Sequence, residues 1–139
     1  MTQSQLKAQL TEDLIENEAL RLKPYRDTVG KLTIGVGRNL DDRGISKEEA
    51  MYLLSNDIGL VLEELGQKVG CWSSLPNPQK IALADMCFNL GWPRLSKFKK
   101  MLTALGKGDF DLAATEALDS KWARQVGQRS ERIATLLRS

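Results

Sequence analysis

The sequence predicts an α+β fold, mainly α, in which a small sheet lobe and a larger helical lobe are joined by a long helix. Three observations lead to this prediction. Leu6, Leu10 and Leu14 recur at helical spacing near the N-terminus. A DTVG turn at residues 27–30 then leads into KLTIGVG at residues 31–37, which has the β-branched residues and exit glycines typical of a strand. No second sheet signal follows, and the rest of the chain shows helical patterns.

Local signals set the bounds of the first elements. Pro24 disfavours helical backbone at Lys23, so the first helix should end before that residue. SKEE at residues 46–49 is a capping box, in which the serine and the glutamate each satisfy a backbone N–H. The amphipathic pattern that follows predicts a helix spanning roughly 30 Å. We therefore expect one domain, with a sheet lobe over about 19–45, a joining helix over about 46–69, and a helical lobe over about 70–139 that also includes the N-terminal helix.

The second half of the chain shows further helices separated by breaks. SSLPNPQ at residues 73–79 is typical of a loop. Residues 81–90, IALADMCFNL, are apolar nearly all round, which predicts a central buried helix. Three polar residues have the chemistry of helix N-caps, namely Ser96, Asp109 and Ser120.

Composition excludes several function classes. The chain of 139 residues contains no histidine, which excludes Ser-His-Asp and Cys-His catalysis and histidine-based zinc sites. Cys71 and Cys87 form no C-x-x-C pattern and are expected to be free thiols. No apolar run is long enough to span a membrane, and the N-terminus lacks the pattern of a signal peptide. We expect no cofactor, no membrane insertion, and synthesis in the cytoplasm without export by that route.

Charge is unevenly distributed along the chain. The whole chain carries a net charge of only +2, which does not argue for nucleic acid as a partner. From Arg94 onward, however, ten basic residues face five acidic ones, so this part carries +5 and the preceding part −3. A basic C-terminal half suggests attraction to an anionic polymer or surface.

Two carboxylates and a hydroxyl surround the predicted passage from helix to sheet. Hydrolysis of a glycosidic bond needs a carboxylic acid to protonate the leaving oxygen and a second carboxylate to activate water or to stabilise positive charge on the sugar. Glu18, beside apolar residues, is the candidate acid and Asp27, on an open turn, the candidate base. Thr33 on the following strand could hold the water. Each residue also has a structural interpretation, as a solvated glutamate, a turn aspartate and a β-preferring threonine.

The segment ENEALRLKPYRDTVGKLTIGVG at residues 16–37 closely resembles the catalytic segment of phage-type lysozymes, the endolysin muramidases typified by the lysozyme of the T-even phages. It matches the family pattern E-x-x-x-L-x-x-Y-x-D-x-x-G-x-x-T-I-G-x-G. Similarity extends through TIGVGRNLDDRGISKEEA, IALADMCFNLGW and WARQVGQR, and so covers nearly the whole chain. The resemblance implies that Glu18, Asp27 and Thr33 are the catalytic residues.

It also implies a function and partners. The expected reaction is hydrolysis of β-1,4 bonds between N-acetylmuramic acid and N-acetylglucosamine in bacterial peptidoglycan, with inversion at the anomeric carbon. We expect a monomer that stays in the host cytoplasm until a holin opens the membrane, and then acts in the periplasm on the cell wall. The expected substrate-binding residues are Leu40, Asn89, Gln125 and Arg129.

Some of these residues have alternative interpretations. Arg129 could pair with Glu18 and position it, or could be a solvated helix arginine. Asn89 and Gln125 could line the cleft or serve as capping and surface amides. Trp122 is expected to anchor the core rather than to stack on sugar.

The chain departs from the family pattern in places. Many relatives have glycine directly after the catalytic glutamate, whereas this chain has Ala19, which predicts ordinary helical geometry there. The GRNLDDRG segment passes directly to the long helix, which implies a small sheet lobe. Two other functions fit parts of the sequence, a lytic transglycosylase and a non-catalytic basic module that binds nucleic acid or wall polymer. Asp27 and Thr33 argue against the first, because a residue pair that handles water is redundant there.

Overall fold

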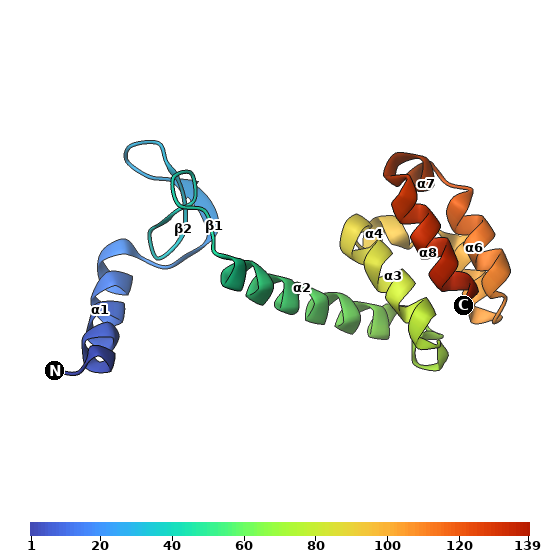
Figure 1. Cartoon of the computed structure of the whole chain (residues 1–139), viewed down its shortest axis with the longest axis horizontal. Helices are drawn as coiled ribbons and strands as arrows, with labels where there is room; N and C mark the ends of the chain where they lie inside the picture. The colour runs from blue at the N-terminus through green and yellow to red at the C-terminus, as the bar shows by residue number, and fades with distance from the viewer. The chain divides into compact units, whose positions relative to one another are not determined.

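A computed structural model describes all 139 residues and divides into two compact units, Met1–Met51 and Tyr52–Ser139, which we call the N-terminal and the C-terminal unit. The α+β prediction is confirmed, since a small three-stranded sheet accompanies eight α-helices. The elements are α1 (Gln3–Glu18), β1 (Arg21–Arg26), β2 (Leu32–Gly35), β3 (Arg38–Asn39), α2 (Lys47–Lys68), the 3-10 turn η1 (Trp72–Ser74), α3 (Asn77–Leu90), α4 (Trp92–Leu95), α5 (Lys99–Gly106), α6 (Phe110–Leu118), α7 (Lys121–Val126) and α8 (Gln128–Arg138) (Figure 1). None of the helices has both the length and the apolar character needed to cross a membrane.

Helix α1 begins at a capping box and ends at Glu18. The Thr2 hydroxyl accepts from the Gln5 backbone N–H at 3.1 Å, and the Gln5 side chain accepts from the Thr2 N–H at 2.8 Å. The predicted end before Lys23 is confirmed. The helix lies in the N-terminal unit together with the sheet, and its expected grouping with the helical lobe stays a prediction.

The prediction of helical geometry at Ala19 is wrong. This residue has φ 64° and ψ 148°, and no other non-glycine residue of the chain has positive φ. Its N–H still donates to the Ile15 carbonyl at 3.0 Å, which closes the last turn of α1. The chain must turn from the helix directly into β1, and Ala19 absorbs that turn in a backbone region that is otherwise almost restricted to glycine.

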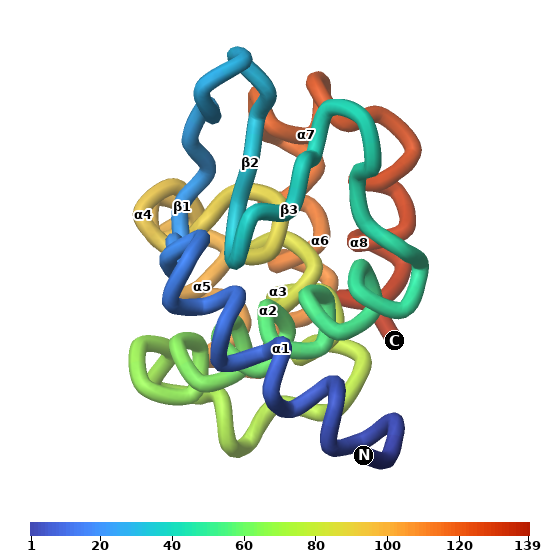
Figure 2. Tube along the Cα trace, turned by 90° about the vertical axis from the view of Figure 1, so that its left-hand side faces the viewer, coloured from blue at the N-terminus to red at the C-terminus, as the bar shows by residue number.

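The sheet is antiparallel with strand order β1-β2-β3, so β2 lies in the centre (Figure 2). Thr33 of β2 pairs with Tyr25 on one side and with Asn39 on the other. The β1–β2 register shifts between Arg21 and Tyr25, around Pro24. Proline has no N–H to donate and is tolerated at an irregularity of an edge strand, which explains how it lies inside β1.

Helix α2 begins at the predicted capping box. The Ser46 N–H donates to Glu49 Oε1 at 2.9 Å, and the Glu49 N–H donates to the Ser46 hydroxyl at 3.1 Å. Arg38 of β3 donates two further hydrogen bonds to the same carboxylate, at 2.8 and 2.7 Å. The Arg38 bonds, with help from Ser46, lower the pKa of Glu49 to about 2. This charged fork ties the last strand to the first turn of α2.

Helices α3, α5, α6 and α8 build the core of the C-terminal unit (Figure 1). Leu83, Leu105 and Leu137 are buried there, and each buried side chain of this size stabilises the fold by about 1.5–3 kcal/mol. Gln79 of α3 is fully buried, and its amide donates to the carbonyl oxygens of Leu137 and Ser139 at 2.9 and 3.0 Å. It thereby satisfies carbonyl groups at the C-terminal end of α8.

One sequence prediction fails in this unit, and the prediction of a buried α3 is confirmed for one face of the helix. The loop expected over 73–79 ends at Pro76, because Pro78 is tolerated in the first turn of α3, where an N–H has no helical partner. Within this unit α3 buries one face rather than its whole circumference, since Ile81 and Phe88 are exposed.

Among the predicted N-caps, two are confirmed and one is wrong. Asp109 caps α6 and Ser120 caps α7. Ser96 instead donates its hydroxyl to the Pro93 carbonyl at 2.8 Å and ends α4. Trp122 is a buried core residue, as predicted. Both cysteines are free thiols, and burial raises the pKa of Cys87.

We expect Ala19→Gly to stabilise the protein. Relief of an unfavourable backbone region that costs about 1–3 kcal/mol should exceed the roughly 0.4–1 kcal/mol of added unfolded-state entropy. Urea unfolding followed by circular dichroism measures the difference. Ala8→Gly, in the middle of α1, is the matched control and should destabilise by about 1 kcal/mol. Equal destabilisation by both variants would contradict strain at Ala19.

The Arg38–Glu49 fork predicts a pH dependence of stability. Because the folded-state pKa of Glu49 lies below its ordinary value of 4.5, its contribution is complete above that value and is lost as the pH falls toward about 2. Glu49→Gln should therefore lower the free energy of unfolding at pH 6, and the deficit should shrink between pH 4.5 and 2. Urea titrations across this range test the expectation. Glu48→Gln, a neighbour without a salt bridge, should show no such convergence.

Candidate active site

Glu18 is the last residue of α1, and its side chain lies against the turn between β2 and β3. A methyl group placed on the Cα of Gly37 in that turn would lie only 3.1 Å from Glu18 Oε2 and 3.3 Å from its Cδ. Gly37 also has φ 73°, which favours glycine. The absence of a side chain at Gly37 therefore makes room for the Glu18 carboxyl group.

Asp27 organises the turn between β1 and β2. Its Oδ1 accepts from the backbone N–H groups of Val29 at 3.0 Å and Lys31 at 2.8 Å. Its own N–H donates to the Lys31 carbonyl at 2.9 Å, and the Gly30 N–H donates to the Asp27 carbonyl at 3.0 Å. The structural interpretation of the D-x-x-G turn is thus confirmed. It uses only Oδ1, and no protein donor contacts Oδ2, so the half-buried carboxylate keeps one oxygen for other partners.

Thr33 is buried in the central strand with only 4% of its surface exposed. Its hydroxyl donates to the Lys31 carbonyl at 2.9 Å. Because a hydroxyl has one hydrogen and two lone pairs, Thr33 Oγ1 can then only accept from a further partner. The Asp27 and Thr33 side chains consequently converge on the backbone of the same residue, Lys31.

The loop after β3 holds this segment in place. Asp41 Oδ2 accepts from the Leu32 N–H at 2.7 Å, and Asp42 binds the Lys31 ammonium group at 3.0 Å. The hydrogen bond and charge of Asp42 raise the pKa of Lys31, and the same contact lowers the pKa of Asp42. Asn39 adds a bond of 3.0 Å to Asp42. The acidic pair thus fixes Lys31 and Leu32, on which the orientation of Asp27 and Thr33 depends.

Gly37, Asp41 and Asp42 were not among the residues predicted for the site. The T-I-G-x-G pattern contained a signal for Gly37, since a glycine at a fixed place often marks a close backbone approach. No local pattern marks the acidic pair, because its partners lie on the neighbouring strand.

The predicted substrate-binding residues lie in both units. Leu40 is half-buried beside the sheet, and its N–H donates to the Leu32 carbonyl at 2.7 Å. In the C-terminal unit, Asn89 accepts from the Trp122 indole N–H at 2.9 Å, and Gln125 is exposed on α7. Arg129 binds Asp85 of α3, with its Nε 2.7 Å from the Asp85 carboxylate. The pairing of Arg129 with Glu18 stays a prediction.

No three Cys, Asp or Glu side chains lie close enough together to share a metal ion. The functional groups available in the N-terminal unit are thus a carboxyl group at the end of α1, a carboxylate with one open oxygen, and a hydroxyl that can accept from water. This set matches the requirements of glycoside hydrolysis.

The chain is similar in sequence to a known protein family and to several known proteins. Residues 15–138 match the model of the family described as phage lysozyme. The chain is 29% identical to the pre-baseplate central spike protein Gp5 of Enterobacteria phage T4 over 92% of its own length, but it spans only 27% of that protein. It is 29% identical to probable T4-type lysozyme 2 of Dictyostelium discoideum, covering 91% of this chain and 92% of that one. It is 32% identical to the SAR-endolysin of Escherichia phage Mu, covering 88% and 75% respectively.

We expect Gly37→Ala to reduce the clearing of suspended bacterial cell walls by about tenfold. The added methyl group would require the Glu18 carboxyl group to move by a few tenths of an ångström, and since a misplacement of about 1 Å can cost on the order of 100-fold in rate, a smaller loss is expected here. Gly35→Ala is the matched control, because Gly35 also has positive φ but nothing lies within 4 Å of the added methyl group. Both variants should lose stability, whereas only Gly37→Ala should lose rate beyond that loss. Equal rates in the two variants would contradict the contact with Glu18.

Proposed function

The chain belongs to the phage lysozyme family of cell-wall glycoside hydrolases, and we propose that it is an N-acetylmuramidase. It hydrolyses the β-1,4 bond between N-acetylmuramic acid and N-acetylglucosamine in bacterial peptidoglycan. The observation that supports the proposal is that Asp27 and Thr33 both bind the backbone of Lys31 and each keeps an acceptor, and we infer that these two acceptors share one water molecule.

Glu18 serves as the general acid. Its carboxyl group donates a proton to the glycosidic oxygen as the bond to the anomeric carbon breaks. The close approach to Gly37 restricts where this group can lie. A proton donor must be held within hydrogen-bond reach of the leaving oxygen, and a defined position for Glu18 favours this geometry.

Asp27 and Thr33 hold and activate the attacking water. The open Oδ2 of Asp27 and the acceptor lone pairs of Thr33 Oγ1 can each take one hydrogen of the same water molecule. The lone pairs of the water oxygen are then free to attack the anomeric carbon, and Asp27 receives the proton that is released.

Direct attack by this water inverts the anomeric configuration. An inverting site keeps its two carboxyl groups roughly 6.5–9.5 Å apart to leave room for water, whereas a retaining site closes to about 5–5.5 Å. In the first arrangement the second carboxylate activates the water, and a neighbouring group that binds water supports it; in the second that carboxylate attacks the sugar itself, and the later water is activated by the acid residue instead. We therefore propose an inverting mechanism.

A lytic transglycosylase is the main alternative. Such an enzyme also depends on a glutamate, but it forms an anhydro sugar without consuming water. The buried hydroxyl of Thr33 and the open oxygen of Asp27 would then have no partner in the reaction. Its product is lighter by one water molecule than the product of hydrolysis, so mass spectrometry separates the two.

Further parts of the proposal concern the setting of the reaction. We expect a monomeric enzyme that stays in the host cytoplasm until a holin opens the membrane. Leu40, Asn89, Gln125 and Arg129 are proposed to bind the glycan. These statements rest on the family resemblance.

Glu18→Gln should reduce turnover of purified peptidoglycan by about 10²–10⁴-fold while the fold is kept, because the amide has the same shape but cannot donate the acid proton. Glu16→Gln, on the same helix and exposed, is the matched control and should keep full activity. Products of the unaltered enzyme should have the mass of hydrolysed muropeptides. Substantial activity in Glu18→Gln, or anhydro products, would refute the assignment.

A further inference from the structure

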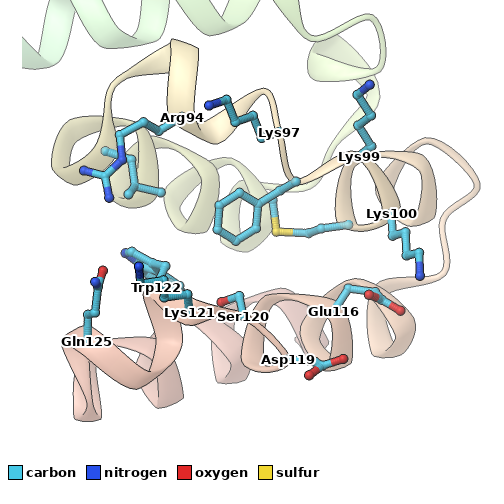
Figure 3. Close-up of a pocket in the computed structure, with 13 residues that line it drawn as sticks. Arg94, Lys97, Lys99, Lys100, Glu116, Asp119, Ser120, Lys121, Trp122 and Gln125 are labelled. Carbon is cyan, nitrogen blue, oxygen red and sulfur yellow. The ribbon is translucent and has the colours of Figure 1, made fainter.

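A concave surface that is separate from Glu18, Asp27 and Thr33 lies entirely within the C-terminal unit. It is a groove of about 540 Å³ with two walls (Figure 3). One wall comes from α4, α5 and the residues between them, and carries Arg94, Lys97, Lys99 and Lys100. The other comes from α6 and α7, and carries Glu116, Asp119, Lys121 and Gln125. It contains none of the three proposed catalytic residues. Gln125, which is proposed to bind the glycan, lies at its edge, but the activity proposed above leaves the positive charge of the groove unused.

The groove is strongly basic. Five cationic side chains face two carboxylates, which gives the lining a net charge of +3. All five cationic residues are exposed, and none forms a salt bridge or a side-chain hydrogen bond within the chain. Four cations outside the groove are different. Lys31, Arg38, Lys68 and Arg129 each bind a carboxylate at 3.0 Å or less. Unneutralised charge that lines a concave surface attracts anions.

The floor of the groove is packed, with the Trp122 ring buried and the Phe98 ring half-buried. The rings of Phe98 and Trp122 meet edge to face, with centroids 6.1 Å apart and an interplanar angle of 83°. Trp122 is only 4% exposed, and its indole N–H is bonded to Asn89. Bases of single-stranded nucleic acids bind by stacking on exposed aromatic rings. The floor therefore offers little surface for stacked bases and disfavours single-stranded nucleic acid, and recognition must come from the charged rim.

The cations of the groove are suited to phosphate. Four of the five are lysines, which act as compact point charges and bind phosphate oxygens from many directions. Arg94 adds a planar fork that fits a phosphate as well as a carboxylate, so the test below compares the two kinds of anion. A groove between two walls also suits a linear chain better than the flat surface of a bilayer.

We propose that this groove binds a linear phosphodiester polymer built from polyol or sugar units. The rim lysines contact successive phosphates, and the packed floor excludes bases. The site would anchor the enzyme to phosphate-bearing polymers of the cell envelope. It does not depend on the proposed hydrolytic reaction.

The test uses lipid-free poly(glycerol phosphate) as the probe and the full chain as the protein. Binding is followed by calorimetry at several salt concentrations. The groove variant combines Lys97→Gln, Lys99→Gln and Lys100→Gln. The matched control combines Arg124→Gln, Arg132→Gln and Arg138→Gln, which removes the same charge from exposed positions outside the groove.

We expect the groove variant to lose at least about tenfold in affinity, and the slope of log affinity against log salt to become shallower by about 2. The control should stay within about twofold of the unaltered protein. If the groove variant fails to fold, Lys121→Gln on the opposite wall should give a smaller loss of the same kind.

Four results would overturn the proposal. Equal losses in the groove variant and the control would mean that net charge alone decides binding. Equally tight binding of polyglutamate, of anionic phospholipid vesicles, or of a single-stranded oligonucleotide would assign the groove to carboxylates, to a membrane or to nucleic acid. None of these results bears on hydrolysis, because the probe contains no bond that a muramidase cleaves.

Discussion

The site depends on the backbone of one residue, Lys31. Its N–H fixes one oxygen of Asp27, and its carbonyl accepts from both the Asp27 N–H and the Thr33 hydroxyl. These bonds leave Asp27 with one open oxygen and Thr33 with acceptor capacity only. Asp41 and Asp42 hold the same segment from the loop after β3. The structural interpretation of the Asp27 turn is confirmed, and the same bonds leave Asp27 and Thr33 the free acceptor atoms that the proposed water site requires.

The passage from helix to sheet has a conformational cost. Ala19 takes a backbone conformation that suits glycine, directly after the proposed acid. Gly37 supplies the space on the other side of Glu18. Strained or closely packed backbone is common around functional sites, because geometry there is set by chemistry rather than by stability. The two residues together define where the α1 carboxyl group can lie.

Sequence patterns predicted the structural features that depend on residues close together in the chain. The capping boxes, the Asp27 turn, the sheet around Thr33 and the long helix α2 all follow from spacing and side-chain type. Patterns did not reveal roles that depend on residues farther away in the chain. Asp41 and Asp42 are examples, because they bond to Leu32 and Lys31. Patterns also failed at Ala19, where alanine propensity favours helix but the direction of the following strand prevails. Ser96 was wrongly predicted to be an N-cap, because no local pattern indicated that the short helix α4 ends at this residue.

The central claim is that Asp27 and Thr33 hold a water that attacks the sugar directly. Proton NMR of freshly cleaved peptidoglycan, recorded before mutarotation, tests it most directly, because it reports the configuration of the new reducing end. Direct attack by water predicts that the α-anomer of the N-acetylmuramic acid end forms first. A β-anomer formed first would mean that Asp27 attacks as a nucleophile, and would contradict the role given to Thr33.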